Sequence, residues 1–272
     1  MINRIINKIK RTLIGGRDQA NRQFHMKTPK QYQDEIQALR DLHKGQRCFV
    51  LGNGPSLNKC DLTLLKDEFS FAVNGIFYKT QEMGYKPNFY MVEDNHVITD
   101  NIEKINAFNC DYKFFPAHYR NEVVPDENTI FIPSDFGFYR KGHPSYCVPR
   151  FSTDISKVIY TGQSVTMMQL QLAYHLGFTE VYLIGMDFNY DLPASTVVDG
   201  VNYTSQEDDP NHFHPDYFGK GKKWHDPKLD RVLKNYEECK KSFEADGRVI
   251  YNATVGGKLE LFDRVDYQKL FS

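Results

Sequence analysis

From residue 46 onward, short apolar runs alternate with polar or amphipathic stretches along this chain. Segments 47–51, 69–73 and 181–185 are continuous apolar runs of strand length, as is typical of strands buried on both faces of a parallel sheet. Segment 163–176 has the length and apolar content of a buried helix, which Gly177 would end. We also predict strands at 88–92, 112–116, 129–133 and 248–251 and a helix at 227–245.

Strands separated by helices predict an α/β fold. We expect a Rossmann-like, mostly parallel twisted sheet with helices on both faces. Ligands of such folds bind beyond the carboxyl ends of the strands. The residues at those ends are small or polar in this chain: Gly52-Asn53-Gly54, Asn74, Glu93-Asp94, Gly185-Met186-Asp187 and Asn252-Ala253-Thr254. The sequence therefore predicts a ligand site at this edge of the sheet.

Residues 1–45 differ in character from the α/β part at 46–272. Within residues 1–16, isoleucines and a leucine recur at helical spacing, with lysines and arginines on the other face. A basic amphipathic helix of this kind can lie in an anionic membrane interface, or it can dock on its own domain or on a second subunit. Residues 17–45 form a polar, helical lead-in. We predict that a long polar segment at about 191–226 forms a lid over the site.

Composition restricts the class of protein. The chain has 272 residues, enough to bury a core without disulfides. Its five cysteines are scattered and odd in number, which is typical of a reducing compartment. We see no secretory signal and no apolar run near the roughly 18–20 residues of a membrane span. A cytoplasmic protein is expected, peripheral on the inner face of the plasma membrane if residues 1–16 bind lipid. The net charge of −1 argues against a general nucleic-acid binder.

A glycine-rich loop follows the first predicted strand: Gly52, Asn53, Gly54, Pro55 and Ser56. Glycines let the backbone turn sharply and expose its amides to an anion, and Ser56 adds a hydroxyl. The loop matches neither a Walker loop nor the dinucleotide fingerprint. A plain tight turn is the alternative, but such a turn would not require the polar groups of Asn53 and Ser56.

This loop, Asn74 and segment 176–188 together resemble the bacterial lipooligosaccharide sialyltransferases. They resemble equally the wider superfamily that contains flagellin-modifying glycosyltransferases and archaeal 6-hydroxymethylpterin pyrophosphokinase-like proteins. Asn252-Ala253-Thr254 with Gly256-Gly257 is similar to the latter two branches. The resemblance extends in blocks over roughly residues 46–262 and specifies the superfamily better than the substrate.

The resemblance implies roles for particular residues. It places a nucleotide, cytidine in the sialyltransferases, against Asn53, Gly54, Ser56 and Asn74. It also implies a general-base histidine five positions before an aspartate that opens a helix, a spacing that His225 and Asp230 match. The full set of expected nucleotide-binding positions is Gly52, Asn53, Gly54, Pro55, Ser56, Asn74, Glu93, Asp94, Ser164, Val165, Thr166, Gly185, Asp187, Phe188 and Tyr190.

His225 also suits the role on chemical grounds, because an imidazole that titrates near neutrality can accept the proton of an acceptor hydroxyl. The alternative is a histidine that caps the helix at 227. The chain departs from the sialyltransferase pattern in three places. Glu93-Asp94 replaces an asparagine, Tyr190 is offset by one position, and Arg150 would have to replace an arginine expected near Gly162.

Two groups of acidic and histidine residues suggest possible metal sites. Asp208, Asp209, His212, His214 and Asp216 crowd one stretch, but no cysteine pair or spaced histidine helix accompanies them, which disfavours zinc. Glu93, Asp94 and Asp187 could instead hold a loosely bound magnesium ion that bridges phosphates. No tightly bound cofactor is predicted.

The expected function is a glycosyltransferase that builds a bacterial surface glycan, such as lipopolysaccharide or capsule, from a nucleotide-activated sugar. The favoured donor is CMP-linked sialic acid or a related acidic sugar, and the acceptor is a glycan or glycolipid. Two alternatives stay open: transfer of diphosphate from ATP to a hydroxymethyl acceptor, and a non-catalytic nucleotide-binding module. Self-association into a homo-oligomer is also left open.

Overall fold

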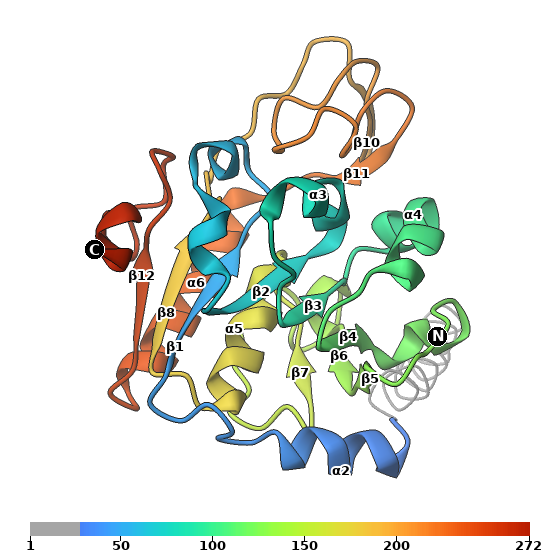
Figure 1. Ribbon diagram of the computed structural model, residues 1–272. Coiled ribbons are helices and arrows are strands. Elements are labelled where there is room, and N and C mark those ends of the chain that lie inside the picture. The colour runs from blue at the N-terminus through green and yellow to red at the C-terminus, as the bar shows by residue number, and fades with distance from the viewer. Residues whose placement is uncertain (1–27) are drawn as a thin grey trace, which may run out of the picture.

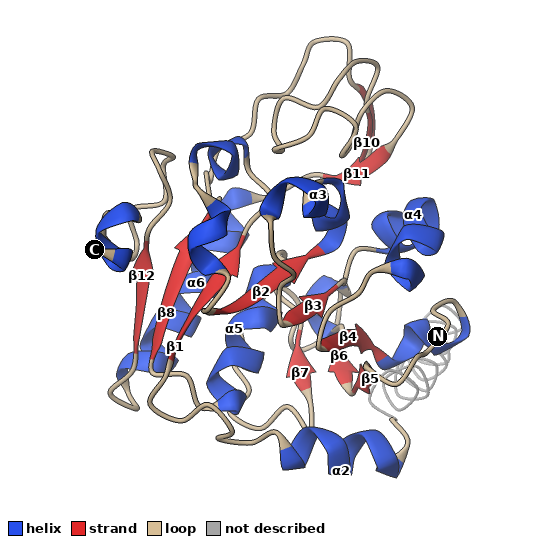
Figure 2. Cartoon of the chain, viewed as in Figure 1, coloured by secondary structure: helices blue, strands red, loops and turns tan. Residues whose placement is uncertain are grey.

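The computed structural model describes residues 28–272 (Figures 1 and 2). The amphipathic segment at residues 1–16, with its expected membrane or docking role, lies outside the described residues. Within the described part, no helix is both long and apolar enough to cross a membrane.

One sheet of eight strands forms the centre of the molecule, and every neighbouring pair in it is parallel. The predicted α/β fold is thus confirmed. The short, two-residue β13 at the exposed edge was not predicted, because so brief a strand leaves no pattern. In spatial order the strands are β13 (Asp263–Arg264), β12 (Val249–Asn252), β8 (Glu180–Ile184), β1 (Arg47–Leu51), β2 (Phe69–Val73), β3 (Phe89–Met91), β4 (Tyr112–Pro116) and β5 (Thr129–Ile132).

Each face of the sheet has its own apolar core, because successive side chains of a strand point to opposite faces. In β1, Cys48 and Val50 join the core under α2 (Lys30–Ala38), α5 (Val165–Leu176) and α6 (Leu229–Glu244). Phe49 and Leu51 join the other core. That second core is covered by α3 (Thr80–Met83), α4 (Asn95–Ala107) and the 3-10 turns η1 (Pro55–Lys59), η2 (Leu62–Leu65), η3 (Asn74–Tyr78) and η6 (Gln268–Phe271).

Helix α5 matches its prediction closely. Every residue of it except Tyr174 is buried, and Gly177 ends it with a φ of 94°. Helix α4 was not predicted. Only three of its thirteen residues are buried aliphatics, and non-helical backbone at Asn101 interrupts it, so its sequence lacks a clear apolar stripe.

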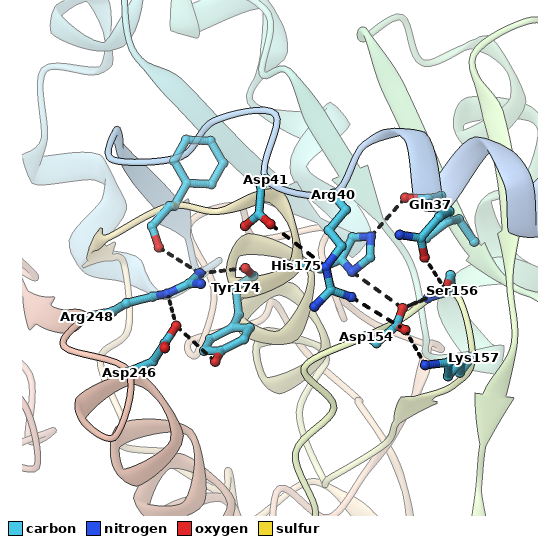
Figure 3. Close-up of polar contacts among 12 residues, drawn as sticks. Gln37, Arg40, Asp41, Asp154, Ser156, Lys157, Tyr174, His175, Asp246 and Arg248 are labelled. Atoms are coloured by element: carbon cyan, nitrogen blue, oxygen red, sulfur yellow. Dashed lines mark hydrogen bonds and ion pairs between the residues drawn. The ribbon is translucent and has the colours of Figure 1, made fainter.

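Helix α2 is tied to the α/β part by a polar network at the end of the molecule opposite the lid (Figures 1 and 3). The Nε2 of His175 in α5 lies 2.9 Å from the carbonyl oxygen of Ile36, whose side chain is fully buried. The Arg40 guanidinium lies 3.5 Å from the Asp154 carboxylate. Beside it, the Ser156 hydroxyl donates to Gln37 at 3.1 Å. The described part of the lead-in, residues 28–45, therefore packs on the α/β core.

A second part of this network holds the start of β12 against α5 (Figure 3). The Arg248 guanidinium donates to the carbonyl oxygen of Tyr174 at 2.6 Å and to Asp246 at 2.8 Å. The Tyr174 hydroxyl donates to the same Asp246 carboxylate at 3.1 Å.

The lid lies at the top of Figure 1, above the carboxyl ends of the strands. It contains a small antiparallel sheet of β9 (Val197–Asp199), β10 (Asn202–Thr204) and β11 (Lys223–His225), with β10 in the middle. Several hydrogen bonds connect the lid to the sheet edge. Among them, the Phe213 amide donates to the carbonyl oxygen of Asn53 at 2.9 Å, and Lys222 Nζ donates to the Tyr78 hydroxyl at 2.7 Å. A separate parallel pair, β6 (Ser134–Asp135) and β7 (Ile159–Tyr160), precedes α5.

Candidate nucleotide-binding and catalytic site

The strand order reverses at β1, whose two neighbours are β2 and β8. Open parallel sheets bind ligands in the crevice outside such a switch point. A cavity lies there in this protein, walled on one side by the lid. It is lined by fourteen of the sequence-predicted residues: Gly52, Asn53, Gly54, Asn74, Glu93, Asp94, Ser164, Val165, Thr166, Gly185, Asp187, Phe188, Tyr190 and His225.

The sequence did not single out several other lining residues. They come from the lid, the turn before α5 and helix α6, and no local motif marks them; only the turn residue before α5 and the aromatic content of the lid gave a weak signal. They include Gln163, Asn211, Tyr217, Phe218, Trp224, Asp226 and Tyr236. His212 also lines the cavity, although the sequence suggested it only as a possible metal ligand.

The loops after β1 and β8 approach each other closely at glycine residues. A Cβ atom added at Gly52 would lie 2.5 Å from the carbonyl oxygen of Gly185, and one at Gly54 would collide with the Asp187 carboxylate. Gly185 also has a φ of 68°, which favours glycine. These glycines are therefore required by the close approach of two loops.

The backbone amides of the glycine loop are used within the protein. The amide of Gly52 donates to Ile184 at 2.7 Å, and that of Gly54 donates to Gly185 at 3.0 Å. The amide of Ser56 donates to the Asp187 carboxylate at 3.2 Å. β8 and the loop after it therefore occupy the amides of Gly52, Gly54 and Ser56, which contradicts the expectation that the loop offers these amides to an anion.

Pro55 and Ser56 do not line the cavity, contrary to expectation. Ser56 is 2% exposed, and its hydroxyl donates to the Asp187 carboxylate at 2.7 Å. The sequence could not show this pairing, because the two residues are 131 positions apart. Ser56 can therefore affect the site through Asp187.

The amino end of α5 opens into the cavity. Ser164 caps the helix by accepting from the Thr166 amide at 3.3 Å, and Ser164, Val165 and Thr166 all line the cavity. A helix of this length has a partial positive charge at its amino end and unpaired amides in its first turn. This helix end offers the cavity the anion-binding feature that the glycine loop lacks.

Three amide side chains of the cavity wall, Asn53, Asn74 and Gln163, have a buried oxygen without a partner in the described chain. Asn53 Nδ2 donates to the carbonyl oxygen of Val73 at 3.0 Å and to the Tyr217 hydroxyl at 2.9 Å. These bonds fix the orientation of the amide, and within residues 28–272 its buried Oδ1 has no partner. Gln163 Oε1 is likewise buried with no partner in the described chain. Buried acceptors are normally satisfied, so a ligand that carries donors would fit here.

Asn74 and Tyr217 join the sheet to the lid. Asn74 has a φ of 45°, and its carbonyl oxygen accepts from the Tyr90 hydroxyl at 2.6 Å. The Tyr217 hydroxyl accepts from the Gly75 amide at 3.3 Å, and a Cβ at Gly75 would lie 2.6 Å from the Tyr217 ring. The lid thus packs directly over the ends of β1 and β2.

His225 lies at the end of β11 and pairs with Asp94. Its Nδ1 is 3.2 Å from Asp94 Oδ2, while Asp94 Oδ1 caps α4 by accepting from the amides of His96 and Val97 at 2.7 and 3.2 Å. The resemblance had placed Asp230 beside His225 in sequence, but Asp230 is exposed in the first turn of α6. The residue before α6 is Lys228, without a side-chain cap, so the helix-cap alternative for His225 does not hold.

The pairing shifts both pKa values. The hydrogen bond to Asp94 raises the pKa of His225 above its ordinary value, although desolvation opposes it. Desolvation acts to raise the pKa of Asp94, but the hydrogen bond and charge of His225 and the two amides hold it below its usual range. Desolvation and the Asp94 charge raise the pKa of Glu93 to about 7. Acidic and basic groups with separated pKa values are typical of catalytic sites.

Among the described residues, no lysine or arginine lines the cavity. Arg150, the proposed substitute for the missing family arginine, donates to Asp135 at 3.0 Å, and its guanidinium carbon lies 4.1 Å from the centre of the Tyr160 ring. It does not line the cavity. Its proposed role in binding the ligand is therefore wrong in this conformation.

The residues considered for metals are engaged elsewhere. His212 bonds Asp209 at 2.7 Å and stacks on Tyr217 with ring centres 4.1 Å apart. Asp94 and Asp187 are held by His225 and Ser56. Over residues 28–272, no group of three or more His, Cys, Asp or Glu side chains could hold a metal ion. The three carboxyl groups suggested for magnesium therefore do not form an ion site among the described residues.

A family model described as 6-hydroxymethylpterin diphosphokinase MptE-like matches residues 22–192. No curated protein matches the sequence. The solved MAf glycosyltransferase from Magnetospirillum magneticum AMB-1 is 16% identical, with a TM-score of 0.47; the match covers 87% of this chain and only 39% of that one. The sialyltransferase CstII from Campylobacter jejuni, solved with cytidine-5'-monophosphate, is 16% identical, with a TM-score of 0.46, and the match covers 82% of this chain and 85% of that one.

Proposed function

This chain belongs to the 6-hydroxymethylpterin diphosphokinase MptE-like family, and on that premise we propose that it is a nucleotide-dependent transferase with His225 as its general base. The observation that carries the proposal is the His225–Asp94 pair at the rim of a cavity on the switch point of the sheet. The favoured reaction is glycosyl transfer from a nucleotide-activated sugar.

The pair supports a specific proton path. With Nδ1 of His225 bound to Asp94, Nε2 is the nitrogen left to accept a proton. The acceptor hydroxyl loses its proton to Nε2 while its oxygen bonds to the anomeric carbon of the donor sugar. The bond from that carbon to the phosphate oxygen breaks, and the nucleotide leaves with the electron pair. The Asp94 carboxylate stabilises the imidazolium that results.

The charge of the cavity favours a donor with one phosphate. Enzymes that handle di- or triphosphates neutralise them with lysine, arginine or magnesium. In the described part of the chain, the cavity wall has none of these cationic side chains, and the amino end of α5 is its anion-binding feature. A nucleoside monophosphate sugar such as a CMP-sugar suits this wall better than ATP does.

The nucleobase and the sugar of the donor are proposed on different grounds. Asn53 Oδ1 and Gln163 Oε1 can accept hydrogen bonds from amino or hydroxyl groups, which the cytosine amine and the ribose hydroxyls both supply. Sialic acid or a related acidic sugar rests on the sequence resemblance alone. A glycan or glycolipid acceptor, membrane contact through residues 1–16 and self-association likewise stay predictions.

The family description supports one rival, diphosphate transfer from ATP to a hydroxymethyl acceptor. A thermal-shift panel of CMP, CDP, UDP, GDP and ATP separates the two. We expect CMP to raise the melting temperature most, since a ligand at a hundredfold excess over its Kd adds about 2.7 kcal/mol to the free energy of unfolding. A larger shift with ATP would favour the rival, and no shift with any nucleotide would contradict both.

A further inference from the structure

The imidazole ring of His96 lies against the face of the His225 ring. The ring centres are 4.5 Å apart and the planes differ by 27°. His96 is the second residue of α4, two positions after the Asp94 that caps this helix. Its buried Nε2 has no hydrogen-bond partner within residues 28–272, so no bond through that nitrogen holds the ring. The sequence analysis did not select this residue.

His225 is thus fixed in two directions by one segment of the sheet edge. Asp94 holds one edge of the imidazole through Nδ1, and His96 covers one face. A turn of the imidazole about its bond to Cβ would break both contacts. Both partners lie where β3 passes into α4, whereas His225 belongs to the lid. The lid therefore has to pack against the start of α4 for His225 to be held in this orientation.

We propose that His96 is a positioning residue for His225, with its ring face holding the plane in which Nε2 meets the acceptor. This inference rests on the proposed role of His225. Stacking also suits the charge that His225 gains, because a cation is attracted to the face of an aromatic ring. A side chain of similar size without a ring cannot supply that face.

The test compares His96→Leu and His96→Ala, which lack a ring, with His96→Phe, which keeps one. We expect the first two to lower kcat by about 10- to 100-fold, since a small misplacement of a reacting group can cost about 10²-fold. Their Kd for CMP should be unchanged. His96→Phe should restore most of the wild-type kcat. The matched control is His43→Ala, which removes a histidine stacked on Phe178 with ring centres 4.9 Å apart, outside the cavity wall.

A second readout does not depend on turnover. In ¹⁵N-histidine spectra of the full chain, we expect wild-type His225 to hold its neutral-form proton on Nδ1, and His96→Leu to show a mixture of tautomers. Unchanged spectra and kcat in His96→Leu would overturn the inference, as would a folded His96→Phe no better than His96→Leu. If wild type transfers no sugar, the proposed function fails, and the spectra still decide whether His96 positions His225.

Discussion

Asp94 Oδ2 lies 3.2 Å from His225 Nδ1 across 131 positions of sequence, and this contact joins the lid to the edge of the sheet at the carboxyl ends of its strands. The same carboxylate caps α4 through its other oxygen. One residue thus caps α4 and contacts the proposed base.

The first prediction concerns His225 itself. His225→Ala should lower kcat by roughly 10²–10⁴-fold, the usual contribution of a general base. The Kd for CMP should stay nearly the same, because the base acts on the acceptor. Steady-state kinetics with nucleotide titration measure both. His225→Asn provides a polar control of similar bulk, and near-normal turnover in either variant would move the base role to another group.

The second prediction concerns the pH dependence set by Asp94. A general base acts in its neutral form, so activity should fall as pH drops through the pKa of His225, which Asp94 holds above its ordinary value. In Asp94→Asn that acidic limb of kcat/KM should move to lower pH. The maximal rate should also fall, by about 10²-fold for a misplaced reacting group. If the acidic limb of the kcat/KM profile does not move in Asp94→Asn, a group other than His225 is responsible for it.

The same pair predicts a window of stability. The raised pKa of His225 adds stability that is fully present below its unfolded value and is lost as pH rises through the folded value. The lowered pKa of Asp94 adds stability above its unfolded value, lost as pH falls through the folded one. The stability lost in His225→Ala should therefore be larger near pH 5 than near pH 9. Urea denaturation at both pH values tests this, and an equal loss at both would contradict the pairing.

A fourth prediction separates Asn53 from Ser56. Asn53→Asp keeps Oδ1-like acceptors but loses the donor to Val73 and Tyr217, so it should weaken CMP binding and loosen the lid. Ser56→Ala should instead cost about 1 kcal/mol of unfolding free energy, typical of one hydrogen bond, with little change in the Kd for CMP. Isothermal titration and chemical denaturation measure the two effects. A large loss of CMP affinity in Ser56→Ala would contradict this prediction and indicate that the Ser56 hydroxyl binds the nucleotide.

The last prediction tests the packing of the two loops. Gly54→Ala places a methyl group against the Asp187 carboxylate and should destabilise the fold. The loss should be smaller in an Asp187→Ala background, since the colliding group is then gone. A double-mutant cycle on unfolding free energies measures this coupling, which contacting residues usually show. Additive losses would mean that Gly54 serves another purpose.

The sequence by itself determined the sheet and the edge at which the site lies. Strands buried on both faces are mostly apolar, so segments such as 69–73 and 112–116 could be predicted from local pattern alone. The small and polar residues at the strand ends followed from the same rule, and fourteen of the expected residues line one cavity.

Only the tertiary structure decided which partner each of these residues has. Asp94 pairs with His225, and the Ser56 hydroxyl donates to Asp187. The amides of Gly52 and Gly54 donate to carbonyl oxygens at the end of β8 and in the loop after it. His96 and Tyr217 gave no signal, because a ring contact between distant segments leaves no periodicity in either one. Local pattern records which side of an element is buried, whereas partners are set by how the elements pack, and the packing of the lid over β1, β3 and β8 brings these side chains together.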